Sequence, residues 1–420
     1  TATLRRDGSS KFGANNKWAM FPSVSLAWRI SEEKFMEEQS VFQDLKLRIG
    51  YGQSGNQNID PYTSQRLYGP QSSQFMYNGE WINSYGVSQN PNPDLKWETT
   101  AMTNIGLDYT IWEGRVSGTL DFYNKETKDM LYKYNVPSPP YQYNQLLANG
   151  ASMTNRGVEF MVNVVAVDRP DFSWTTNFNV AYNKNEIGSL DSNVDNLSIS
   201  ERYEGTMYLE GWTAQTVSIV KPGLPIGTFY TYKYMGYDAK QQKTLYENAA
   251  GEIVTIDKLK SPDDYQVVGS ALPKVTFGWN NTFRYKRWDL NFFLRGVTGN
   301  KIFNASRADL SRLTQAAICN ISHEAVEDGI MEAPQPSSRW LENGSFLKLD
   351  NVTLGYQFDT EKMPGINNLR VYITGQNLFT ITKYTGIDPE VSLSGLAPGI
   401  DNRNYYPKTR SFLLGVNISF

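Results

Sequence analysis

The last ten residues, Ser411–Phe420 (SFLLGVNISF), alternate between apolar side chains and mostly small or polar ones. Successive side chains of a β-strand point to opposite faces, so this alternation predicts a strand with one apolar face. That face carries Phe412, Leu414, Val416, Ile418 and Phe420. No later segment of the sequence can cover it, and in a transmembrane β-barrel such a face is buried in lipid. We therefore expect these five side chains to face lipid.

The same alternation recurs along the whole chain. It is clearest in Val116–Tyr123, Phe172–Tyr182, Val275–Arg284 and Leu369–Gln376. Noisier examples are Val24–Ile30, Leu45–Tyr51, Ile105–Ile111, Val158–Val164 and Trp288–Leu294. In Phe346–Phe358 the alternation changes phase near Asp350, which indicates a β-bulge.

The connections between these segments are alternately short and long. The short turns are 112–115, 168–171, 285–288 and 364–368. The long connections are Gly55–Leu95, Met130–Met153, Asn183–Leu272, Thr298–Gly344 and Thr380–Thr409. Outer-membrane barrels have short periplasmic turns and long extracellular loops. The sequence therefore predicts an all-β fold, a transmembrane antiparallel β-barrel whose C-terminal strand ends at the periplasmic rim.

Counting back from the C-terminal strand gives roughly 12 strands, or about 14 if Trp212–Asp238 holds a further pair. A pair is required there, because a single extra strand would place short turns on both sides of the membrane. Thr1–Leu4 reads as part of a strand already under way. We therefore expect the chain to be a piece of a longer protein, with the remaining strands upstream.

The composition fits this fold. Aromatic residues make up 13% of the 420 residues, yet the mean hydropathy is −0.49. A polar lumen, a lipid-facing band and aromatic girdles produce that balance. The net charge of −3 argues against a nucleic-acid partner, which would need a basic stripe. No stretch approaches the roughly 20 apolar residues of a membrane-spanning helix.

Nothing in the sequence indicates catalysis, a metal or a cofactor. The one histidine, His323, and the one cysteine, Cys319, share a long loop without an evident third group to orient them. Asp257–Asp264 (DKLKSPDD) is acidic but lacks the spacing of a calcium-binding loop. We therefore expect the protein not to be an enzyme, and we assign no catalytic, cofactor or metal-ligating residue.

Aromatic residues in the long loops are the weak candidates for substrate contacts, because flat rings beside Asn, Gln and Asp suit sugars or peptides. The main candidates are Trp81, Tyr85, Tyr141, Trp212 and Trp340. A wider set adds Tyr68, Tyr77, Tyr143 and Tyr203. The alternative for each is that the ring packs one loop on another or lies in the outer aromatic girdle.

Short motifs spread along the chain resemble one family, the SusC/RagA-type TonB-dependent outer-membrane transporters of Bacteroidetes. In the first part they are Phe21–Arg29 (FPSVSLAWR), Leu45–Asn56 (LKLRIGYGQSGN), Asn92–Glu98 (NPDLKWE) and Asn155–Glu159 (NRGVE). In the second part they are Gly344–Leu349 (GSFLKL), Gly375–Thr380 (GQNLFT), Asp388–Glu390 (DPE) and Tyr406–Arg410 (YPKTR). Each motif is short, but their order along the chain makes the set specific.

The resemblance implies that residues 1–420 are the C-terminal part of a barrel of about 22 strands. The N-terminal plug, the TonB-contacting segment and the early strands would lie outside this chain. It implies active uptake of a large nutrient, an oligosaccharide or a peptide, across the cell outer membrane. It also implies TonB as energy source, a SusD-like lipoprotein lid, and possible dimers of transporter–lid pairs.

Other functions remain open on the sequence alone. A passive outer-membrane porin or a surface-binding adhesin would have the same barrel composition, and the plug and TonB-contacting segment would separate them. A membrane-embedded enzyme would need a nucleophile, a base and an orienting group, which the lone His323 does not supply. A soluble propeller would need internal repeats, and none is evident.

Overall fold

The computed structural model describes residues 1–192, 199–207, 209, 215–361, 363–403 and 406–420. In this described part, twelve antiparallel strands follow one another in a single sheet, and β8 (Met130–Asn135) pairs with β9 beside that path. In sheet order the twelve are β1 (Ala2–Gly8), β2 (Trp18–Arg29), β3 (Phe42–Asn56), β6 (Glu98–Ile111), β7 (Val116–Lys128), β9 (Gln145–Arg169), β10 (Phe172–Ser192), β18 (Val275–Tyr285), β19 (Trp288–Thr298), β22 (Phe346–Gln357), β23 (Asn368–Thr382) and β25 (Ser411–Ser419).

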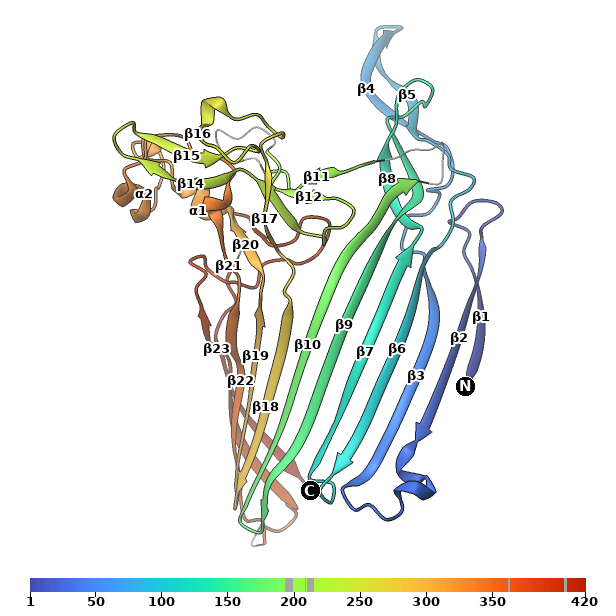
Figure 1. Ribbon diagram of the computed structural model, residues 1–420, viewed down its shortest axis with the longest axis vertical. Coiled ribbons are helices and arrows are strands. Elements are labelled where there is room, and N and C mark those ends of the chain that lie inside the picture. Colours follow the sequence, from blue (N-terminus) through green and yellow to red (C-terminus); the bar gives the residue numbers. More distant parts are fainter. Residues whose placement is uncertain (193–198, 208, 210–214, 362, 404–405) are drawn as a thin grey trace.

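The all-β, antiparallel prediction is confirmed, with the lower strand number. The described residues of 212–238 add no strand pair to the main sheet. They form β12 (Ser218–Val220), β13 (Thr228–Thr231) and β14 (Lys233–Asp238), which belong to smaller sheets. Figure 1 shows short connections at the lower end of the sheet, where the C-terminus lies, and long ones at the upper end.

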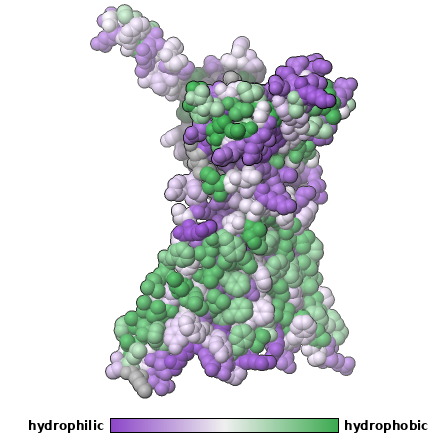
Figure 2. Space-filling model, turned by 90° about the vertical axis from the view of Figure 1, so that its left-hand side faces the viewer, coloured by the Kyte–Doolittle hydropathy of each residue, from purple (hydrophilic) through white to green (hydrophobic). Residues whose placement is uncertain are grey.

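Strand pairing aligns apolar residues from one strand to the next. One row crosses five consecutive strands through Leu26, Ile49, Ile105, Phe122 and Val158. Another crosses the last five through Phe283, Leu290, Leu354, Ile373 and Leu414. Figure 2 shows an apolar band across the lower body on the face turned to the viewer, with polar residues below and above it. Such a band is the surface that an outer-membrane barrel presents to lipid.

The C-terminal strand contributes to this band. The exposed fractions of its five apolar side chains run from 47% for Ile418 to 85% for Phe420. Leu414, at 77%, lies opposite Ile373 of β23. The expected alternation is present, and lipid contact of these five residues stays a prediction.

The opposite face of the sheet is polar and tied together by ion pairs. Arg48 of β3 donates from Nη2 to Asp108 of β6 at 2.7 Å and to Asp121 of β7 at 3.1 Å. On the same polar face, toward the C-terminal strands, Arg370 of β23 donates from Nε to Asp289 of β19 at 2.8 Å. A polar inner face beside an apolar outer face is the alternation of a barrel wall.

Two tyrosines on the polar face lie over glycines of the next strand. Tyr123 is opposite Gly157, and Tyr372 is opposite Gly415. A β-carbon at either glycine would collide with the tyrosine ring. These positions therefore need glycine, and each ring covers the surface that the missing side chain would leave open.

The β-bulge expected near Asp350 is confirmed. The pairing of β22 shifts register against both neighbouring strands, and Asp350 is skipped in both ladders. Its carboxylate instead accepts a hydrogen bond from Arg295 Nε at 2.7 Å. The phase change in the sequence therefore corresponds to a side chain turned to an ionic partner.

Arg295 also belongs to a charge cluster that anchors the loop before β25. Its Nη1 lies 2.6 Å from Glu390, and the ammonium groups of Lys348 and Lys408 lie 2.7 Å and 2.6 Å from the same carboxylate. Burial opposes ionisation of Glu390, but the three cations outweigh it and lower its pKa to about 2. The cluster fastens this loop to β19 and β22.

The long loops carry secondary structure of their own. β4 (Leu67–Tyr77) and β5 (Glu80–Gln89) form a hairpin that projects from the upper end (Figure 1). The smaller sheets also contain β11 (Arg202–Glu204), β15 (Lys243–Glu247), β16 (Ile253–Thr255), β17 (Gln266–Ser270), β20 (Lys301–Asn304), β21 (Leu341–Asn343) and β24 (Ile400–Asp401). The helices of the described ranges are α1 (Ala305–Leu310) and α2 (His323–Asp328), with short 3-10 turns at Ile30–Glu32, Lys34–Met36, Ile256–Lys258, Leu313–Gln315 and Ser338–Trp340. Among the residues described, none of these helices has the length and hydrophobicity needed to cross a bilayer.

A charge on the outer face of β25 should destabilise the sheet. We expect Leu414→Arg to lower the free energy of unfolding in lipid by about 2–4 kcal/mol, because the guanidinium would enter the apolar band. Asn417→Ser, on the other face, should have almost no effect. Urea titration of the refolded full-length protein in vesicles measures both. Equal stability of Leu414→Arg and the parent would show that the face is assigned incorrectly.

Removing the carboxylate of Glu390 should loosen its loop. Glu390→Gln leaves neighbouring cations without a shared anion, so the free energy of local opening should fall by about 1–3 kcal/mol. Amide hydrogen exchange of residues 386–392 in the full-length protein measures the change. Glu361→Gln, an exposed carboxylate in the turn after β22, is the control. Since the pKa of Glu390 is lowered, the stabilisation from its ion pairs should be fully present above pH 4.5. It should be lost progressively as the pH falls toward 2. Unchanged exchange in Glu390→Gln would contradict the anchoring role.

Candidate functional site

The aromatic candidates chosen from the sequence do not come together in one place. Trp81 and Tyr85 lie on β5 of the projecting hairpin and are 65% and 72% exposed. Tyr141 is half-buried in the loop between β8 and β9, against a buried cluster around Tyr134. Trp212 lies outside the described residues.

Trp340 is part of a hydrophobic core. It is 1% exposed, and its indole Nε1 donates to the backbone oxygen of Gln335 at 2.8 Å. The guanidinium of Arg339 lies 4.7 Å from the centroid of the ring, and that of Arg307 lies 5.6 Å away. Its position supports the alternative given for these aromatics, which is packing of one loop on another.

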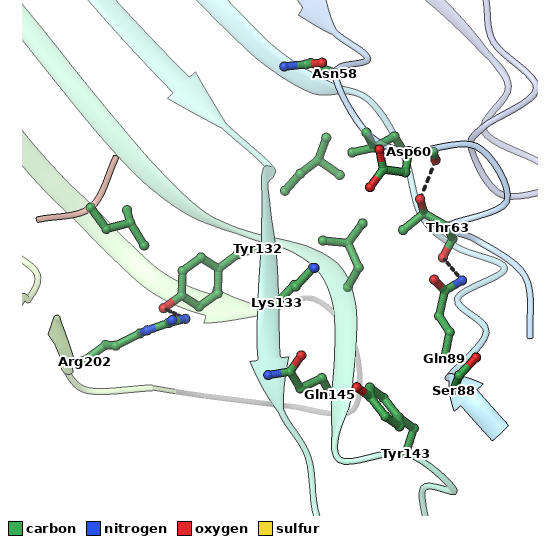
Figure 3. A pocket seen from close by; sticks show the side chains of 14 residues that line it. Asn58, Asp60, Thr63, Ser88, Gln89, Tyr132, Lys133, Tyr143, Gln145 and Arg202 are labelled. Atoms are coloured by element: carbon green, nitrogen blue, oxygen red, sulfur yellow. Dashed lines mark hydrogen bonds between the residues drawn. The ribbon is translucent and has the colours of Figure 1, made fainter. Parts of the chain in front are cut away.

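A cavity of about 680 Å³ lies among the loops beside β8 (Figure 3). Its walls come from stretches that are far apart in the sequence: residues 58–63 before the hairpin, residues 88–89 at the end of β5, β8, and residues 143–147 around the start of β9. Arg202 of β11 and Leu396 of the loop before β25 complete the lining. The volume is typical of a pocket for a small ligand or for part of a larger one.

Two buried asparagines hold one wall of the cavity. Asn90 donates to the backbone oxygens of Tyr143 and Gln145 at 2.5 Å and 2.9 Å, and accepts from the Tyr143 amide at 3.1 Å. Asn92 donates to the backbone oxygen of Leu147 at 2.9 Å. Both asparagines are less than 5% exposed. These bonds hold the backbone of residues 143–147 and do not involve the side chains of Tyr143 and Gln145, which line the cavity.

Gln89 holds the opposite wall in the same way. Its amide nitrogen donates to the backbone oxygens of Tyr62, Thr63 and Gln65 at 3.0, 3.1 and 2.7 Å. The turn 62–65 is thereby closed against the base of the hairpin. Both walls are built by side-chain amides that bind backbone carbonyl groups.

A tyrosine–arginine pair forms another side of the cavity. Arg202 donates to the phenol oxygen of Tyr132, and its guanidinium lies 4.8 Å from the centroid of that ring. Burial raises the pKa of Tyr132, and the nearby Arg202 opposes this. Arg202 also pairs with Glu204, so its charge is balanced within β11. Figure 3 shows this pair across the cavity from Asp60 and Thr63.

Several polar side chains of the lining have no hydrogen-bond or ion-pair partner among the described residues. They belong to Asn58, Asp60, Ser88, Lys133, Tyr143 and Gln145. Amides and hydroxyls both donate and accept, a carboxylate accepts, and an ammonium group donates. The cavity therefore offers a mixed set of hydrogen-bonding groups held on a fixed backbone.

Sequence reasoning identified little of this site. Of the five main aromatic candidates, none among the described ones lines the cavity, although Tyr143 of the wider set does. Asn58 and Gln145 carry no motif that separates them from other loop amides. Their proximity depends on contacts such as the one between Asn90 and Tyr143, which are 53 positions apart.

The residues considered for catalysis are not assembled into a site. His323 is the first residue of α2, and Cys319 is an exposed free cysteine. Within the described ranges, no group of three or more His, Cys, Asp or Glu side chains is placed to hold a metal ion.

The chain is similar to known outer-membrane receptors along its whole length. It is 35% identical to the TonB-dependent receptor SusC of Bacteroides thetaiotaomicron and 32% identical to the TonB-dependent receptor P26 of Formosa agariphila. Each comparison covers 100% of this chain, but only 42% and 44% of the respective receptor. The chain thus spans less than half the length of these relatives.

The chain is also similar to solved structures of transporters over its whole length. The RagAB peptide transporter matches with a TM-score of 0.83 at 28% identity, over 100% of this chain and 45% of that one. A RagAB peptide importer in an "open-open" state matches with a TM-score of 0.82 at 26% identity, with the same coverage.

The family model described as "TonB dependent receptor-like, beta-barrel" matches residues 1–378. These relatives are transporters rather than enzymes, and they lie in the outer membrane. The chain belongs to the TonB-dependent receptor β-barrels of the SusC/RagA type and forms part of an outer-membrane barrel.

Proposed function

We propose that the protein containing this chain actively imports a large nutrient, an oligosaccharide or a peptide, across the outer membrane. The observation that carries the proposal is the match of residues 1–378 to the TonB-dependent receptor barrel. The likeness to a RagAB peptide importer at a TM-score of 0.83 supports a bulky cargo. The structured extracellular loops provide walls on which such a cargo could be held.

The energy would come from TonB, which would contact a region of the protein outside this chain. A passive porin needs no such coupling, and its uptake would follow the concentration gradient of the solute. A surface adhesin would bind without any uptake. Energy dependence therefore separates the three functions.

A SusD-like surface lipoprotein would cover the loop face as a lid. RagAB importers have been solved in states described as "closed-closed" and "open-open". These paired state names support the proposal that the protein containing this chain also assembles as two transporter–lid units. The projecting β4–β5 hairpin and the loops around the cavity lie on the face that such a lid would cover.

Uptake should depend on both TonB and the lid. In the native host, deletion of TonB or of the neighbouring lid lipoprotein should reduce uptake of one radiolabelled nutrient to the level of a transporter deletion. A strain with the lid gene restored is the control. Uptake that persists without TonB would support a porin, and binding without uptake would support an adhesin.

A further inference from the structure

We propose that the outer face of β7, β9 and β10 binds a phosphorylated lipid of the outer leaflet. An acyl chain of the lipid would lie in a groove at the upper end of the apolar band, and its phosphate would bind Arg156 and Lys184. The inference goes beyond the proposed uptake function, because this face of the sheet is turned to the membrane rather than to the cargo.

The apolar band ends abruptly on these three strands, which lie side by side (Figure 1). Its last row across them consists of Phe122, Val158 and Tyr182. The next row on the same face, two positions further from the periplasmic turns, consists of Asn124, Arg156 and Lys184. Two residues of a strand span about 7 Å, so the two cations directly border the band. They lie at the level where the headgroups of the outer leaflet begin.

A groove of about 400 Å³ crosses this boundary. Its apolar part includes Ile105, Phe122 and Tyr182, each between 45% and 49% exposed. Its polar end is formed by the side chains of the next row, including both cations. Exposed apolar surface is stabilised by an apolar neighbour, and an acyl chain is the neighbour that a membrane supplies to this face.

The guanidinium group of Arg156 is held in place and still has donors to offer. Its Nε donates to Asn124 Oδ1 at 3.0 Å, across the pairing of β9 with β7. Among the described residues, its Nη1 and Nη2 have no hydrogen-bond or ion-pair partner. A guanidinium presents N–H groups in a planar fork that matches the oxygens of a phosphate. Arg156 is therefore oriented by one neighbour and available to an anion.

The charges around the groove leave an excess of cations. Lys184 lies opposite Arg156 on β10, and its ammonium group lies 2.8 Å from Glu186, which also interacts electrostatically with Arg156. The Lys184 side chain is 65% exposed, so this ion pair contributes little and can be exchanged for a phosphate. Glu126, in the row above, is paired with Lys128 at 3.2 Å. Two cations facing one carboxylate attract an anionic headgroup.

The groove and the cations together select a lipid. A free phosphate ion would bind the cations but leave the apolar part of the groove uncovered. An uncharged lipid would cover the apolar part but leave the donors of Arg156 without an acceptor. A phosphorylated lipid satisfies both, and it is already concentrated in the leaflet beside this face.

Lipid binding by the full-length transporter tests the assignment. The purified protein in detergent would be titrated with monophosphoryl lipid A, with the same lipid lacking its phosphate, and with inorganic phosphate. Native mass spectrometry counts the bound lipid. We expect the phosphorylated lipid to bind about 10-fold more tightly than the dephosphorylated one, because charge-assisted hydrogen bonds to the phosphate are lost. Inorganic phosphate at the concentration of the lipid should not displace it.

Two variants with opposite effects place the phosphate at these residues. Arg156→Gln should weaken the phosphorylated lipid about 10-fold and leave the dephosphorylated lipid unchanged. Glu186→Gln should strengthen the phosphorylated lipid about 2- to 3-fold, because Lys184 loses its competing carboxylate. Lys383→Gln, which removes the same charge from an exposed residue just after β23, is the control and should change neither affinity.

Four results would overturn the inference. They are equal affinity of the parent for both lipids, displacement of the lipid by an equal concentration of inorganic phosphate, equal losses in Arg156→Gln and Lys383→Gln, and weakening of both lipids alike by Arg156→Gln. The last result would show a general disturbance of the wall instead of a lost phosphate contact. None of these measurements involves nutrient uptake, so their outcome is independent of the proposed function.

Discussion

Backbone pairing in a medium without water is the constraint on which the structure depends. In lipid, every N–H and C=O group needs a partner within the protein, and a continuous antiparallel ladder provides one along each strand. In the described part of the chain, twelve strands are paired in that way, each with its neighbours in one sheet. Pairing also fixes register, so apolar residues such as Leu26 and Ile49 lie side by side and form a band. The polar inner face follows from the same alternation, with Arg48 and Asp108 paired across neighbouring strands.

Much of the wall could be predicted from the sequence because lipid and lumen impose opposite demands on alternate residues. The strand at Ser411–Phe420 and the phase change at Asp350 both come from that two-residue period. The period disappears at the loop ends of the strands, where residues such as Leu146 of β9 and Ile187 of β10 are buried in hydrophobic clusters with loop residues. For this reason the 25 residues of β9 and the 21 residues of β10 exceed the strands expected from alternation.

The candidate site could not be predicted in the same way. An aromatic residue in a long loop has no periodic pattern that reveals its surroundings, so Trp340 and Trp81 look alike in sequence. In the structure one is 1% exposed and the other 65%. The cavity depends on contacts between distant loops, and residues such as Asn90 reveal their role only when their partners are known. The aromatic residues of the long loops indicated that the loops contact a substrate. Their position within the fold decides which of these side chains are exposed to one.

The side chains that hold the cavity wall differ from most of those that line the cavity, and this has a consequence for how such transporters diversify. Asn90 and Asn92 hold the backbone of the cavity wall without lining it, whereas the side chains of Asn58, Lys133 and Gln145 line the cavity and hold none of that backbone. Substitutions of these lining residues can change the surface offered to cargo while the hydrogen bonds of Asn90 and Asn92 remain. A lineage could therefore move from one nutrient to another through a few loop substitutions, while the membrane wall and the loop framework stay the same.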